Sequence, residues 1–125
     1  MKIWINLLKE NGEILQYIPK IKKEVSKVIS NEKVGGEIGI TLGDSRLLRK
    51  INRTYRKKDK ITDVLSFNLG NDREIMGDIY ISIGRAKEQS RLYNVTLLDE
   101  LIRLAVHGTL HVLGYTHKEM RENGY

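Results

Sequence analysis

Three histidines near the end of the chain are the residues whose type and spacing best suit them to do chemistry. His107, His111 and His117 are the only histidines among the 125 residues, and all three lie within one window of eleven residues. On a helix, His107 and His111 would project from one face, about 6 Å apart along the axis. Gly114 would end that helix and let the chain turn, so that His117 comes back towards the pair. The spacing therefore predicts a metal site formed by three imidazoles.

The expected occupant of such a site is a catalytic zinc ion, one per chain. Three histidines leave the fourth tetrahedral position free for water, whereas four protein ligands close a structural zinc site. A zinc ion held in this way acts as a Lewis acid and generates hydroxide near neutral pH. The sequence has no Cys, which excludes disulfides, cysteine-ligated zinc and a cysteine nucleophile.

The histidine spacing matches the ligand positions of the metzincin peptidase motif H-E-x-x-H-x-x-G-x-x-H, but one essential residue differs. The motif's glutamate is the general base of the peptidase, and Gly108 occupies its position in this sequence. Glycine cannot transfer a proton. Hydrolysis of a peptide or small molecule is therefore a minor alternative, and a substrate that does not depend on that glutamate is favoured.

Hydrophobic periodicity predicts the elements that position the histidines. Residues 2–8, 37–42, 62–69 and 77–83 are predicted strands, and residues 14–29, 45–55, 84–93 and 96–113 are predicted helices. The polar turn at 71–74 predicts that the last two strands form an antiparallel hairpin. The prediction is one metal-dependent hydrolase domain over residues 1–125. Its fold class is α+β, with a small mixed sheet of about four strands packed against helices and a zincin-like metal helix near the C-terminus.

The positive charge of the chain is concentrated in one segment. The formal net charge is +6, and between residues 46 and 60 there are eight basic residues and a single acidic residue, Asp59. A local excess of this kind favours a polyanionic partner. The alternative interpretation is an exposed loop whose charges are solvated and bind no partner. The basic residues of the segment are Arg46, Arg49, Lys50, Arg53, Arg56, Lys57, Lys58 and Lys60.

The sequence offers no feature of a membrane or secreted protein. Its apolar runs are far shorter than the roughly 20 residues of a membrane-spanning helix, and its first residues carry charges where a signal peptide is apolar. We therefore expect a cytoplasmic protein that does not associate with membranes.

Three segments resemble motifs of the YbeY family of bacterial endoribonucleases. Residues 107–117, HGTLHVLGYTH, resemble the family signature H-G-x-L-H-x-x-G-Y-D-H. Residues 52–56 and 62–67 resemble its N-x-x-Y-R and T-D-V-L-S-F stretches, and residues 77–82 resemble its G-D-I-x-I-S strand. Together the motifs cover most of residues 52–117.

The resemblance implies a zinc-dependent endoribonuclease that is specific for single strands. Such an enzyme matures the 3′ end of small-subunit ribosomal RNA and acts in ribosome quality control, so single-stranded RNA, ribosomal RNA or the ribosome is the implied partner. The resemblance also implies that His107, His111 and His117 ligate the metal and that Arg56 is the functionally important arginine. Arginine suits a phosphate because its planar fork donates two parallel hydrogen bonds. Lys57 and Lys58 would add attraction to the RNA backbone.

The sequence departs from the family pattern in ways that keep a second hypothesis open. Thr116 stands where the motif has Asp, Ile61 stands where Pro or Ala is usual, and the chain ends at Tyr125 before the family's acidic C-terminal helix. Threonine forms hydrogen bonds but cannot serve as a base. The alternative is a non-catalytic RNA-binding ribosome assembly factor with a structural metal.

Two further groups of residues are candidates for substrate contact. Asp63 and Ser66 begin the T-D-V-L-S-F strand beside the basic segment, and we expect them to bind substrate. Asp63 ranks above Asp78 as a carboxylate for proton transfer or for support of the site. Tyr55 and Phe67 could stack on unpaired bases, although core positions are favoured for both.

Overall fold

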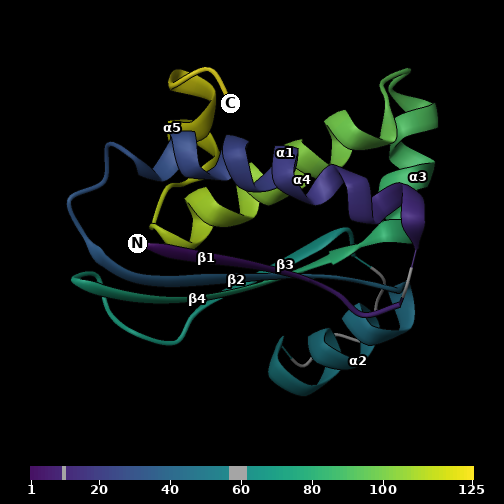
Figure 1. Cartoon of the computed structure of the whole chain (residues 1–125). Coiled ribbons are helices and arrows are strands. Elements are labelled where there is room, and N and C mark those ends of the chain that lie inside the picture. The colour runs from purple at the N-terminus through teal and green to yellow at the C-terminus, as the bar shows by residue number, and fades with distance from the viewer. Residues whose placement is uncertain (10, 57–61) are drawn as a thin grey trace.

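A four-stranded mixed sheet with strand order β1-β2-β4-β3 forms the centre of the molecule (Figure 1). The computed structural model describes residues 1–9, 11–56 and 62–125. Three of the strands are parallel neighbours, β1 (Lys2–Leu7), β2 (Gly35–Gly43) and β4 (Glu74–Ser82). The fourth strand, β3 (Val64–Asn68), pairs antiparallel with β4 at the edge of the sheet. The predicted hairpin and the α+β fold class are confirmed.

Parallel pairing requires a crossover between β1 and β2, and α1 (Gly12–Ile29) provides it. Asn11 begins this helix, since its side chain accepts hydrogen bonds from the backbone N–H groups of Glu13 and Ile14. Several of its apolar residues are buried, as the periodicity predicts. These are Ile14, Ile21, Val25 and Ile29.

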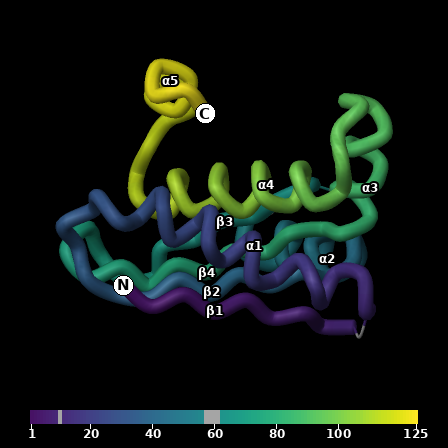
Figure 2. Tube along the Cα trace, turned by 45° about the horizontal axis from the view of Figure 1, so that its top comes forward, coloured from purple at the N-terminus to yellow at the C-terminus, as the bar shows by residue number. Residues whose placement is uncertain are grey.

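The helices are divided unequally between the two faces of the sheet (Figure 1). One face is covered by α1, α3 (Ile83–Leu92) and α4 (Leu97–Val112), and the other carries α2 (Ser45–Arg56). In the tube view of Figure 2, α4 runs along the sheet and α5 (His117–Glu122) lies beyond its C-terminal end. The core lies between the sheet and the first group of helices, where Ile38, Ile79 and Leu101 are fully buried.

Most element bounds differ from the sequence prediction by one or two residues, and two larger differences have a clear physical reason. The strand β4 begins at Glu74 and not at Gly77, because the side chain of Asn71 accepts hydrogen bonds from the N–H groups of Arg73 and Glu74 and closes a tight turn. The helix α5 was not predicted, since six residues are too few to show a periodicity. In the described part of the chain, no helix is both long enough and apolar enough to cross a membrane.

Candidate active site

The helix that carries two of the histidines lies directly on the sheet because Gly108 has no side chain. A Cβ atom at this position would lie 2.8 Å from Cγ2 of Ile79 and 3.1 Å from Oγ of Ser66. A glutamate here, as in the metzincin motif, would collide with β3 and β4. The same glycine that removes the peptidase base therefore allows α4 to approach the sheet closely, so that His107 and His111 are held by a buried helix.

The end of α4 turns the chain back towards the histidine pair. Gly114 has a φ angle of +96°, which favours glycine. Its N–H group donates to the carbonyl oxygen of His111 at 3.0 Å, and the N–H group of Tyr115 donates to that of Leu110 at 2.9 Å. These two bonds form a Schellman motif, which ends the helix as the sequence predicts.

Two interactions then fix His117, the first residue of α5. Thr116 caps the helix: its hydroxyl accepts from the N–H group of Glu119 at 3.1 Å, and the Glu119 carboxylate accepts from the Thr116 N–H group at 3.2 Å. Met120 is buried and packs against α4 beside Leu110. An aspartate also caps helices well, so Thr116 preserves a structural role at the position where the family motif has Asp.

The histidines lie close together at this end of α4. The ring centres of His111 and His117 are 4.5 Å apart, with the ring planes at 76°. Burial lowers the pKa of His107, and the charges of Arg103 and of the other two imidazoles lower it further. Burial and the neighbouring His117 lower the pKa of His111. Both imidazoles are therefore neutral at pH 7, which is the form that binds a metal ion.

The donor chemistry fits a zinc ion, but the arrangement of three ligands is not complete. Across residues 1–9, 11–56 and 62–125, no three His, Asp or Glu side chains are arranged so that they could hold one metal ion. The His111 and His117 rings are 4.5 Å apart, whereas His107 lies one helical turn before His111 on α4. The zincin-like metal helix and the zinc ion therefore stay predictions.

Arg56 comes from the face of the sheet opposite to the histidine-bearing helix α4 (Figure 1). It is the last residue of α2, and its Nη2 atom donates to the carbonyl oxygen of Ser66 on the edge strand at 3.1 Å. Its guanidinium carbon lies 5.3 Å from the centre of the Phe67 ring. Its charge also contributes to the lowered pKa of His111. The structure thus brings the motif arginine and the histidine cluster to the same edge of the sheet.

The four residues expected to bind substrate have different positions. Ser66 points towards α4, since its Oγ atom lies 3.1 Å from the place that a Cβ atom on Gly108 would occupy. Asp63 is engaged in structural hydrogen bonds, because its carboxylate accepts from the Val64 N–H group at 2.8 Å and from Nε2 of Gln89 at 3.1 Å. Lys57 and Lys58 lie outside the described residues.

Asp78 lies on the face of the sheet that carries α2. It accepts a hydrogen bond of 2.7 Å from the hydroxyl of Tyr80. Burial and this hydrogen bond raise the pKa of Tyr80 to about 12. The sheet separates Asp78 from the side of β3 that faces the histidine-bearing helix.

Sequence reasoning missed a buried ion pair next to the histidines. The Glu100 side chain is 1% exposed and accepts two hydrogen bonds from Arg103, at 2.7 Å from Nε and at 2.8 Å from Nη2. Arg103 precedes His107 by four residues, so the two share a face of α4. The four-residue spacing could have indicated that Arg103 lies beside His107. The burial of Glu100, which makes this ion pair structurally important, is apparent only in the fold.

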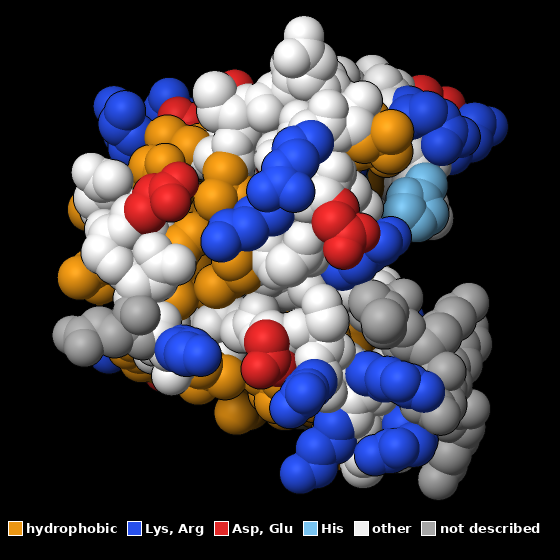
Figure 3. All heavy atoms as spheres, turned by 90° about the vertical axis from the view of Figure 1, so that its right-hand side faces the viewer, with side chains coloured by type: hydrophobic (Ala, Val, Ile, Leu, Met, Phe, Trp, Pro, Cys, Tyr) orange, Lys and Arg blue, Asp and Glu red, His pale blue; other side chains and the backbone are white. Residues whose placement is uncertain are grey.

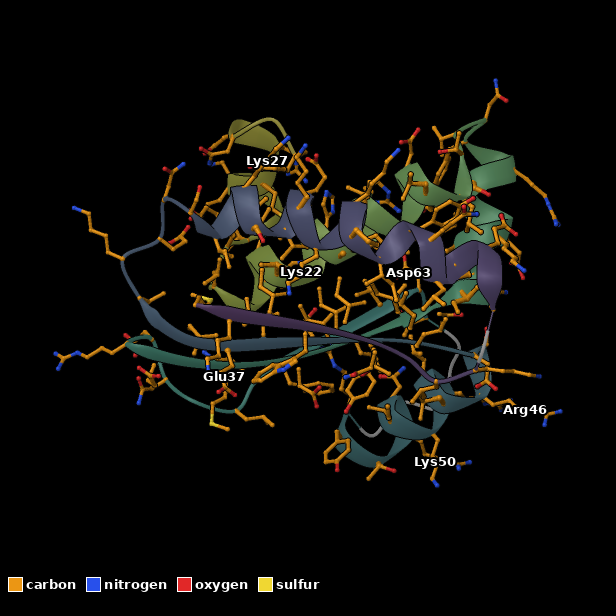
Figure 4. All side chains as sticks on the ribbon, in the orientation of Figure 1. Lys22, Lys27, Glu37, Arg46, Lys50 and Asp63 are labelled. Atoms are coloured by element: carbon orange, nitrogen blue, oxygen red, sulfur yellow. The ribbon has the colours of Figure 1, made fainter. Side chains whose placement is uncertain are left out.

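The basic residues of α2 form an exposed surface. Arg46, Arg49, Lys50 and Arg53 are all exposed, and Figure 4 shows Arg46 and Lys50 projecting from the outer side of the helix. In Figure 3 the Lys and Arg side chains gather over α2, and a histidine surface lies on the same face of the molecule. The described part of the basic segment is thus borne on a helix, whereas Lys57, Lys58 and Lys60 lie outside the described residues.

These features define an α+β domain with a histidine cluster at the end of a buried helix and an arginine-rich helix at the same edge of its sheet. The family model described as "Endoribonuclease YbeY" matches residues 6–124. The chain belongs to this family, which confirms the resemblance found in its motifs.

Individual relatives agree with this assignment. A Geobacillus kaustophilus protein named Endoribonuclease YbeY is 40% identical, and the match covers 94% of this chain and 85% of the relative. A Carboxydothermus hydrogenoformans protein of the same name is 41% identical over 104 residues, covering 82% of this chain and 73% of the relative. The solution structure of TM1509 from Thermotoga maritima superposes with a TM-score of 0.68 at 28% identity, covering 96% of this chain and 82% of that one.

Proposed function

We propose that this chain is a cytoplasmic, zinc-dependent endoribonuclease that cleaves single-stranded RNA. Its role would be 3′ maturation of small-subunit ribosomal RNA and ribosome quality control. One observation carries the proposal: Arg56 donates a hydrogen bond to the Ser66 carbonyl oxygen, and the Ser66 hydroxyl faces Gly108, the residue that follows His107 on α4. Cleavage of a phosphodiester needs positive charge at the phosphate beside an electrophilic centre; Arg56 would supply the charge, and a zinc ion held by the histidines would supply the electrophile.

The residues of the chain have separate roles in this proposal. His107, His111 and His117 would hold the zinc ion, which when bound supplies a Lewis acid and an activated water. Arg56 would bind the phosphate through the N–H groups not used by Ser66, and its contact with Phe67 and its hydrogen bond to β3 orient the guanidinium. The exposed basic face of α2 would attract the rest of the RNA backbone.

The names of the relatives support an activity on RNA. The relatives from Geobacillus kaustophilus and Carboxydothermus hydrogenoformans are both named endoribonucleases. Family membership therefore favours a nuclease over the alternatives of a peptide hydrolase and of an assembly factor that binds RNA without cutting it.

Cleavage of a labelled single-stranded RNA, with a matched duplex alongside, tests the proposal. We expect Zn²⁺-dependent cleavage of the single strand alone and about one zinc ion per chain by elemental analysis. Arg56→Ala should lower the cleavage rate by about 10²- to 10³-fold, the usual cost of removing one donor to a developing charge. Arg73→Ala, in the exposed turn between β3 and β4, is the matched control.

The same experiment separates the alternatives. RNA binding with no metal-dependent cleavage would support the assembly factor, whereas cleavage that survives His111→Ala would remove the histidine site from the reaction. The product ends identify the nucleophile, because attack by the ribose 2′-OH leaves a 2′,3′-cyclic phosphate and attack by water does not.

A further inference from the structure

An exposed aromatic residue lies immediately before the motif arginine. The Tyr55 side chain is 71% exposed in the last turn of α2, although its sequence context favoured a core position. Its ring makes an edge contact with Phe67, with ring centres 5.9 Å apart at 62°. Phe67 in turn contacts Tyr80, with ring centres 6.5 Å apart at 71°. Two partly buried rings therefore support one that is open to solvent.

These rings border a small hollow on the α2 face of the sheet. Its volume is about 100 Å³, which is too small for a whole nucleotide but sufficient for the edge of a flat ring. Leu69, which is 68% exposed, stands at its rim with Tyr55. The residues that line it are Ile51, Tyr55, Phe67, Leu69, Asp78 and Tyr80.

The polar groups in this hollow suit a base and not a phosphate. The Tyr80 hydroxyl donates to the Asp78 carboxylate at 2.7 Å. A carboxylate repels a phosphate, but it accepts hydrogen bonds from the amino groups at the edges of bases. It has acceptor positions beyond the one that Tyr80 uses. The hollow therefore combines an aromatic wall with an acceptor for base edges.

Arg56 connects the hollow to the histidine cluster. Its guanidinium lies over Phe67, which lines the hollow, and donates to Ser66, whose side chain faces α4. A phosphate bound by Arg56 would thus lie at the edge strand, with the histidines on one side of β3 and the aromatic rings on the other. A strand that contacts both must turn around this edge.

We propose that Tyr55, supported by Phe67 and Tyr80, is a stacking platform for an unpaired base of the RNA, next to the phosphate held by Arg56. This inference rests on the proposed function, because it takes RNA as the substrate. A base within a duplex is already stacked and paired, so only a single strand can place a base on this platform. The platform is therefore a structural source of selectivity for single strands.

The test measures binding of a short single-stranded RNA, with and without added Zn²⁺, and binding of the same RNA with abasic sites. Tyr55→Ala should weaken binding of the intact RNA by about 5- to 150-fold, the range measured for loss of one base–aromatic stack. It should leave binding of the abasic RNA unchanged, and it should leave the salt dependence of binding unchanged because no phosphate contact is lost. Tyr55→Phe should bind the intact RNA as the wild type does.

Tyr93→Ala is the matched control, since Tyr93 is 55% exposed and also lies beside an arginine, with Arg103 5.9 Å from its ring centre. It should bind both RNAs normally. Equal losses for Tyr55→Ala on intact and abasic RNA, or no loss on either, would overturn the platform. Because Tyr55 is exposed, we expect its variants to fold, and circular dichroism checks this.

The two hypotheses fail in different ways. If the wild type cleaves RNA but Tyr55→Ala changes the binding of intact and abasic RNA equally, or of neither, only the platform is wrong. If Tyr55→Ala shows the base-dependent loss but no protein cleaves RNA, the platform stands and the nuclease proposal is wrong.

Discussion

The helices α4 and α2 lie on opposite faces of the same sheet and differ sharply in burial. Nine of the 16 residues of α4 are buried, including the charged Glu100. Only Leu48 and Asn52 are buried among the 12 residues of α2, and its arginines are exposed. A buried helix holds side chains in fixed positions, whereas an exposed basic helix can meet a long, flexible polyanion. The histidines thus lie on or next to the buried helix, whereas α2 carries the exposed basic residues and ends in Arg56 beside the edge strand.

The largest effect should come from the buried ion pair on α4. Arg103→Ala leaves the Glu100 carboxylate buried without its partner, and we expect the free energy of unfolding to fall by about 2–3 kcal/mol. This is less than the 3–5 kcal/mol of fully buried pairs because the Arg103 side chain is 40% exposed. Urea denaturation measures the change.

The pair between Arg85 and Glu88 on α3 is the control. It has the same spacing in the helix and a separation of 2.8 Å, but its side chains are 39% and 64% exposed. Arg85→Ala should therefore cost less than about 1 kcal/mol. Equal losses for the two arginine variants would contradict the distinction between a buried and an exposed element.

The close contact of α4 with the sheet should give the next largest effect. Gly108→Ala places a Cβ atom 2.8 Å from Ile79, and we expect it to lower the free energy of unfolding by about 1–2 kcal/mol despite alanine's better helix propensity. Gly12→Ala, at the start of α1, meets nothing within 4 Å and should be neutral or stabilising. A stabilised Gly108→Ala protein would show that α4 has room to move.

On α2 we expect the reverse pattern, with little effect on stability and a measurable effect on binding. Lys50→Gln should change the free energy of unfolding by less than about 0.5 kcal/mol. If Lys50 contacts one phosphate, the slope of log affinity against log salt concentration should become shallower by about 0.7. Lys22→Gln on α1 is the control, because Lys22 is also exposed but lies on the other face of the sheet (Figure 4). Identical slopes for the two variants would remove α2 from the RNA-binding surface.

The smallest effect concerns pH and the burial of the histidines on α4. Burial lowers the pKa of both His107 and His111 in the folded chain, while the ordinary value of about 6.5 applies to the unfolded chain. The unfolded state thus binds more protons as pH falls below about 6.5, so the free energy of unfolding of the metal-free protein should decrease on acidification. NMR titration of the imidazole signals should give midpoints below 6.5 for both. Midpoints at or above that value would mean that the end of α4 is more solvated than its packing indicates.

Much of the fold could be predicted from local patterns. The apolar spacing in α1 predicted its buried face, and Gly114 was predicted to end α4, where its N–H group donates to the carbonyl oxygen of His111. The turn at 71–74 predicted the hairpin. In each case the signal lies within a few residues, because periodicity, capping and turns depend on neighbouring residues in the chain.

Contacts between distant segments could not be predicted in this way. Tyr55 looked like a core residue by its type, but α2 ends at the edge of the sheet and leaves its ring exposed. Gly108 looked like a missing catalytic residue, and only the approach of α4 to Ile79 and Ser66 explains it. Thr116 looked like a lost acid, whereas it caps the short helix that carries His117.

The sequence by itself determined that this protein has three clustered histidines, no cysteine and one strongly basic segment, and its motifs predicted the family. These properties depend only on residue types and their spacing. The tertiary structure decided that Arg56 binds the edge strand β3 at Ser66, whose hydroxyl faces α4, that Glu100 holds Arg103 one turn before His107, and that Tyr55 is exposed to solvent next to Arg56. Such pairings depend on how the helices pack on the two faces of the sheet, which no local pattern in the chain specifies.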